Sequence, residues 1–144
     1  MQPEDRLPST ILDKSIKRGN EVGWRRSDFI SVVEAAMKIP MAVIGGQVQY
    51  VFPDGTCELY WLSYDPDARR REENWVEYCN RSADECMSKF QSLIATVDIE
   101  KEALGFEFVK AKKEAGVNIQ QHEVFILYFD DSETGYTLIQ TPVC

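Results

Sequence analysis

The chain has 144 residues, of which 44% are hydrophobic and 28% charged, an ordinary balance for a single globular domain over residues 1–144. This composition excludes a disordered chain, a collagen-like repeat and a coiled coil, and no apolar run is long enough for a transmembrane helix. The polar start, Met1–Arg6, does not read as a secretory signal. We therefore expect a cytoplasmic protein without a membrane contact, in which the four cysteines stay as thiols.

The charge is distributed unevenly along the chain. Residues 1–53 hold 7 basic and 6 acidic residues, whereas residues 54–144 hold 9 basic and 18 acidic ones, so the net charge of −8 arises from the second part. This bias argues against naked nucleic acid as a partner. It is typical either of a solvated surface or of an acidic surface that steers a basic protein partner.

The first forty residues predict two helices. Residues 1–8 are expected to form a poorly ordered lead-in. Capping residues and apolar spacing predict a short helix over residues 9–18 and a turn over residues 20–24. A second helix is predicted from residue 27 until Pro40 ends it.

The pattern then changes to that of a β-hairpin. Residues 41–52 are first continuously apolar and then alternate, residues 53–56 have turn chemistry, and residues 57–64 predict the returning strand. Gly45 and Gly46 interrupt the first strand. They indicate a β-bulge or a close approach of the backbone.

The longest periodic segment predicts a helix from about Glu72 to Thr96, although a capping-box pattern at Ser82 offers a later start. A further helix is predicted to end at Gly116. Residues 123–129 and 136–141 predict two strands, joined by a hairpin loop over residues 130–135.

These elements, in the order helix, helix, strand, strand, helix, helix, strand, strand (ααββααββ), predict an α+β fold. We expect a largely antiparallel sheet with helices packed on one face. The strand near Phe125 should be the best buried.

The sequence contains no convincing catalytic constellation. His122 is the single histidine, and no serine or cysteine lies in a nucleophile-elbow context. Cys79 and Cys86 are spaced as core thiols on one helix face and lack the further ligands that zinc requires. We expect neither a catalytic residue nor a bound metal or cofactor.

Aromatic and acidic residues gather around the first hairpin. Alternation sends Tyr60 and Trp61 to opposite faces, so at least one large ring is expected near the surface. Aromatic rings beside acids suit the binding of a basic protein. The candidate contacts are Trp61, Asp65, Asp67, Asp130, Asp131 and Glu133.

Several segments together resemble family 40 of the bacterial immunity proteins. The resemblance spans about residues 27–95. It is carried by the helix Phe29–Ala36, the segment Ile39–Tyr50 with its Gly-Gly pair, Trp61, and the helix start Trp75–Ser82. The resemblance implies a small cytoplasmic protein, encoded beside a polymorphic or contact-dependent toxin, that binds and occludes the toxin domain.

Two other functions are compatible with the residues. One is a metal-dependent hydrolase that uses Asp65, Asp67 and His122. The other is a non-enzymatic housekeeping interaction module, for example a homodimer that pairs through the edge of the last hairpin. The immunity function predicts a monomer or a weak homodimer.

Overall fold

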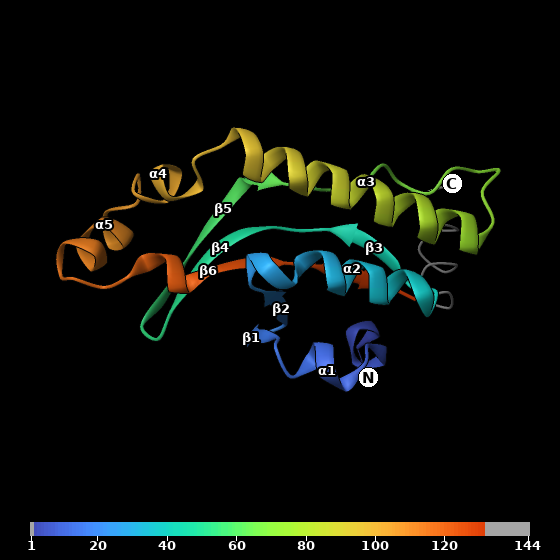
Figure 1. The fold of residues 1–144 in the computed structure, drawn as a ribbon, viewed down its shortest axis with the longest axis horizontal. Helices are drawn as coiled ribbons and strands as arrows, with labels where there is room; N and C mark the ends of the chain where they lie inside the picture. Colours follow the sequence, from blue (N-terminus) through green and yellow to red (C-terminus); the bar gives the residue numbers. More distant parts are fainter. Residues whose placement is uncertain (1, 132–144) are drawn as a thin grey trace.

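The computed structural model describes residues 2–131 and has the α+β fold that the sequence predicts (Figure 1). Its helices in this range are α1 (Ser9–Leu12), α2 (Phe29–Lys38), α3 (Trp75–Thr96), α4 (Ile99–Ala103) and α5 (Glu107–Glu114), with 3-10 helices η1 (Pro3–Arg6), η2 (Arg26–Asp28) and η3 (Ile119–His122). None of these helices is both long enough and apolar enough to cross a membrane.

The strands form one large and one small antiparallel sheet. They are β1 (Ile16–Arg18), β2 (Glu21–Trp24), β3 (Ala42–Gly45), β4 (Gln47–Phe52), β5 (Gly55–Ser63), β6 (Glu123–Ile126) and β7 (Tyr128–Asp130). The large sheet has the order β1-β2-β6-β4-β5, and β3 pairs with β7 in the small sheet. All four residues of the central strand β6 are buried, which confirms the prediction for the strand near Phe125.

The predicted strands over residues 41–52 and 123–129 are each divided in two. The first breaks at Gly46 and the second at Leu127, so that β4 pairs with β6 while β3 pairs with β7. A Cβ atom on Gly46 would lie 1.8 Å from the carbonyl oxygen of Ile126. The glycine pair therefore serves a close backbone approach at the point where the chain changes sheets.

The N-terminal region contains a hairpin where the sequence predicted the end of a helix and a turn. The helix stops at Leu12, and β1 pairs with β2 so that Arg18 lies opposite Glu21. Gly19, with φ 61°, and Asn20 form the two-residue loop. Gly-Asn is a favoured hairpin turn, and this signal overrides the weak helical spacing before it. The predicted element order is accordingly not confirmed.

The long helix α3 has the apolar stripe that its spacing predicts. It begins at Trp75, where the Asn74 side chain accepts a hydrogen bond from the Glu77 amide and the Glu77 carboxylate accepts one from the Asn74 amide. Ser82 is buried within the helix and donates to the Cys79 carbonyl, so the alternative start there is wrong. The segment after it holds α4, which the sequence did not predict, and α5, which ends before Gly116 as expected.

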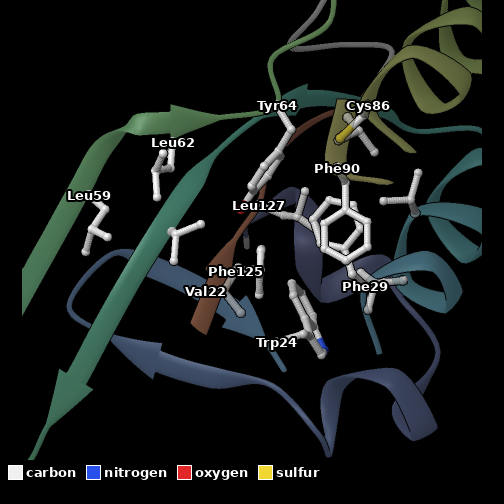
Figure 2. Close-up of a cluster of buried hydrophobic side chains, with 14 of the residues drawn as sticks. Val22, Trp24, Phe29, Leu59, Leu62, Tyr64, Cys86, Phe90, Phe125 and Leu127 are labelled. Carbon is white, nitrogen blue, oxygen red and sulfur yellow. The ribbon is translucent and has the colours of Figure 1, made fainter. Parts of the chain in front are cut away.

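Helices α2 and α3 lie side by side and pack aromatic rings against the central strand (Figures 1 and 2). Phe29 of α2 stacks on Phe90 of α3 with ring centroids 3.9 Å apart, and both rings contact Phe125 of β6. Each such pair stabilises the fold by about 1 kcal/mol beyond the burial of its area. Cys86 is a buried free thiol in this core (Figure 2), and Cys57 and Cys79 are also free and buried.

The first residues contact the folded domain. Leu7, next to the 3-10 helix η1, is only 4% exposed and belongs to the core, and Trp24 donates its indole hydrogen to the Ile11 carbonyl. The predicted strand over residues 136–141, Glu133 and Cys144 lie outside the described residues.

The substitution Gly46→Ala tests the sheet junction. The added Cβ would collide with the Ile126 backbone and would also lie 3.2 Å from the Tyr64 ring, so we expect the free energy of unfolding to fall by at least about 2 kcal/mol. Urea denaturation of both proteins measures this loss. Gly19→Ala is the matched control because its φ is also positive but its Cβ would lie in open space; an equal loss in the two variants would contradict the proposed contact.

Candidate partner-binding surface

The end of β5 presents two large aromatic rings to solvent. Opposite β4, the pairing changes from Val48 with Leu59 to Gln47 with Ser63, so the residues between form an outward bulge. Tyr60 is 74% exposed and Trp61 45% exposed, which confirms that at least one ring lies near the surface. The bulge explains why both rings are exposed although simple alternation would separate them.

Trp61 is held in place by the region around α4. Its indole nitrogen donates to Glu102 Oε1 over 2.9 Å, and its ring stacks on Phe106 with centroids 6.0 Å apart. Tyr60 meets Trp61 edge to face, with centroids 5.2 Å apart and planes at 89°. We name the three rings Tyr60, Trp61 and Phe106 the aromatic shelf. With Glu102 and Gly105 they line a pocket of about 330 Å³.

Asp65 forms hydrogen bonds that stabilise the fold. Its carboxylate accepts a hydrogen bond of 2.9 Å from the Gly46 amide, and a Cβ on Gly45 would collide with it. Lys89 of α3 donates to the Asp65 carbonyl over 2.6 Å. The predicted contact residue is thus engaged at the sheet junction.

Asp67 lies on a loop that is fixed to α3 by Arg81. The Asp67 side chain is exposed, with Arg70 at 3.7 Å. Arg81 donates to the carbonyl oxygens of Asp67 and Ala68 and forms a two-pronged ion pair with Glu73, with N to O distances of 2.5 and 2.8 Å. This hydrogen-bonded pair lowers the pKa of Glu73 to about 2. Asp67 is therefore presented to solvent from an ordered loop.

The acids at the end of β7 differ in exposure. Asp130 is only 5% exposed, and its Oδ1 has no hydrogen-bond partner within the described chain. Burial, and secondarily the neighbouring Asp131, raise the pKa of Asp130 to about 6. Asp131 is half-buried and Glu133 lies outside the described residues. Of the predicted contacts within residues 2–131, Trp61, Asp65 and Asp67 are therefore exposed, and the Asp65 carboxylate is already bonded to the Gly46 amide.

A cluster of hydrogen-bonded side chains, two of them acidic, joins residues of β2, β4, β5 and β7. The buried Gln49 amide donates to Glu21 over 3.0 Å and to Glu58 over 3.2 Å. The Tyr128 hydroxyl donates to Glu21, and burial together with this bond raises the pKa of Tyr128 to about 12. This cluster is not predictable from the sequence, because its members come from strands that are distant in the chain.

The three residues of the hydrolase hypothesis are not brought together. Asp65 contacts Gly46 at the start of β4, whereas His122 hydrogen-bonds the Val51 carbonyl near its end. At roughly 3.3 Å per residue these points are about 16 Å apart. His122 also stacks on Phe52, so its ring has a packing role. Within residues 2–131 no group of three or more acidic, histidine or cysteine side chains is arranged to hold a metal ion.

Comparison of the chain with protein-family models, curated proteins and solved structures finds no match.

Removal of the Glu73 carboxylate tests whether the Arg81–Glu73 ion pair stabilises the loop that carries Asp67. Because its folded pKa lies below the ordinary 4.5, its stabilising effect is complete above pH 4.5 and is lost as the pH falls toward 2. Glu73→Gln should lower the free energy of unfolding by about 1 kcal/mol at pH 7. The difference from the unmodified protein should vanish near pH 2. Glu72→Gln, at an exposed neighbouring residue, is the control. An equal loss of unfolding free energy in this variant would argue against a stabilising Arg81–Glu73 ion pair.

Asp130 has the opposite dependence on pH. Its folded pKa is raised, so the ionised carboxylate destabilises the fold once the pH rises through the interval from 3.8 to about 6. Asp130→Asn should therefore increase the free energy of unfolding by about 1 kcal/mol at pH 7.5 and by little at pH 4. Denaturation curves at the two pH values measure this, and a variant destabilised at pH 7.5 would show that the ionised form is needed.

Proposed function

We propose that this protein is an immunity protein that binds and occludes the domain of a bacterial toxin. The observation that carries the proposal is the aromatic shelf: Tyr60 and Trp61 are exposed, and yet the rings are held in one arrangement by Glu102 and by their contacts with one another. Tyrosine and tryptophan dominate binding energies at protein interfaces, and rings that are already ordered lose little entropy on binding.

The charge of the chain supports a basic partner. The acidic second part of the sequence contains the shelf, and Asp67, Glu58 and Glu102 of this part have exposed side chains. A negative surface increases the rate at which a positive partner associates and disfavours nucleic acid. The resemblance of residues 27–95 to family 40 of the bacterial immunity proteins favours a toxin domain as that partner.

In this proposal the protein acts without catalysis and without a cofactor. It works in the cytoplasm by stoichiometric binding, as a monomer or a weak homodimer. The separation of Asp65 from His122 along β4 disfavours the hydrolase, because those residues would have to converge on one metal ion. A housekeeping interaction module would use the same kind of exposed surface and differs only in its partner.

The proposal is tested with the purified full chain and the toxin domain encoded beside it. We expect a 1:1 complex by light scattering and a Kd that increases with salt. Trp61→Ala should raise the Kd at least about tenfold, because it removes a preordered central ring. Val76→Ala is the matched control, since Val76 is 52% exposed but lies at the start of α3, away from the shelf.

Three outcomes would contradict parts of the proposal. Failure of the toxin domain to bind would contradict the function itself. Equal Kd values for Trp61→Ala and the unmodified protein would exclude the shelf as the interface. Catalytic turnover that is lost in His122→Ala would favour the hydrolase instead.

A further inference from the structure

We propose that the pocket of the aromatic shelf receives an arginine side chain of the partner protein. This inference rests on the proposed function and specifies the chemistry of its contact. It follows from the shape of the pocket, from the position of its carboxylate, and from the distribution of the protein's own cations.

The pocket is lined by the kinds of side chain that bind cations. Tyr60 and Trp61 meet at 89° and form an aromatic corner. Aromatic faces carry partial negative charge, and cages of such rings bind cationic head groups. The lining is completed by Phe106, Glu102 and Gly105, and the volume of about 330 Å³ is ample for one long side chain.

Glu102 supplies the countercharge at a fixed position. One of its oxygens, Oε1, accepts the Trp61 indole hydrogen, while the described residues provide no hydrogen bond or ion pair to the other. A carboxylate accepts several hydrogen bonds, so the second oxygen is available to a donor that enters the pocket. A guanidinium is planar and lies flat on a ring while it donates to a carboxylate, and a compact ammonium does not combine both contacts as well.

The chain's own cations leave this pocket unfilled. Within residues 2–131 several other rings have an arginine or lysine over their faces, including Trp75, Tyr78, Phe108 and Phe125. Two lysines of α5 are engaged in ion pairs of their own, Lys112 with Asp54 and Lys113 with Glu100. None of the cation-to-ring contacts in that range involves the shelf. Tyr60 and Trp61, the exposed aromatic rings of the described residues, thus have no internal cation over their faces.

The test uses NMR of the full 15N-labelled chain and a small probe, Nα-acetyl-arginine amide. The chain has three tryptophans, and each indole hydrogen has a different acceptor: Ile11 for Trp24, Glu102 for Trp61 and Pro40 for Trp75. We expect the probe to shift the Trp61 indole signal and to leave the other two unchanged. The uncharged isostere, Nα-acetyl-citrulline amide, should not shift it.

Two variants identify the carboxylate. Glu102→Gln should weaken probe binding about threefold or more, because a charged partner is lost while the side-chain shape is kept. Glu107→Gln is the matched control, since Glu107 is exposed on the adjoining helix α5 and does not line the pocket. Each variant's unaltered Trp24 signal verifies that it is folded.

The outcomes separate this inference from the proposed function. Equal shifts from the arginine and citrulline probes, or a Trp61 signal that does not move, would overturn the arginine site even if the toxin domain binds. Selective binding of the arginine probe would support the site even if the toxin domain does not bind. With the complex in hand, loss of affinity in Glu102→Gln but not in Glu107→Gln would support both.

Discussion

The contact between Gly46 and the Ile126 carbonyl is the constraint on which the rest of the structure depends. At this point the chain passes from the small sheet to the large one between β3 and β4, and from the large sheet back to the small one between β6 and β7. The two strand breaks therefore lie side by side. The Tyr64 hydroxyl lies within hydrogen-bonding distance of the Ile126 and Gln47 carbonyls, which share its single hydrogen, and the Asp65 carboxylate accepts the Gly46 amide hydrogen. These bonds satisfy backbone groups that the interrupted ladders leave free.

The same junction explains why the aromatic shelf is exposed. Tyr64 is buried, the Asp65 carboxylate is bonded to the Gly46 amide, and Leu59 is fixed by its pairing with Val48. The chain between Leu59 and Tyr64 therefore has to span two fixed points. It contains more residues than β4 offers opposite it, and the excess bulges outward. Tyr60 and Trp61 occupy that bulge, where Glu102 orders them. Bulges commonly direct a side chain toward a functional surface, and exposed apolar rings are a local departure from stability of the kind found at functional sites.

Prediction from sequence succeeded where the spacing was long or the turn chemistry was strong. The apolar stripe of α3 and the hairpin around Pro53-Asp54 were both confirmed, because each depends on neighbours in the chain. The Gly-Asn pair at Gly19 is a recognisable hairpin turn, and in the structure it outweighs the helical spacing before it. The sheet change at Gly46 and Leu127 was not predictable in the same way, because it depends on a contact between segments that are about eighty residues apart in sequence.

The sequence predicts the kind of residues at the candidate site better than it predicts the individual residues. Trp61 and Asp67 are exposed as expected, but acidic residues next to a strand end are also good acceptors for backbone amides, and Asp65 is used in that way. Asp130 is buried by tertiary packing, which cannot be inferred from the turn-forming residues around it. Glu102 was missed because it belongs to a short helix that periodicity does not reveal.

In the proposed complex with a basic partner, this distribution of residues separates two contributions to binding. The regional negative charge acts over a distance of about 10 Å and therefore influences the rate of encounter more than the final contact. The aromatic shelf acts only at contact, where burial of its rings slows dissociation. Glu102 belongs to both, because it is charged and also holds Trp61 in place. A partner that places a guanidinium against it would convert part of the long-range attraction into a directional bond, and the ordered indole would set that bond's geometry before the partner arrives.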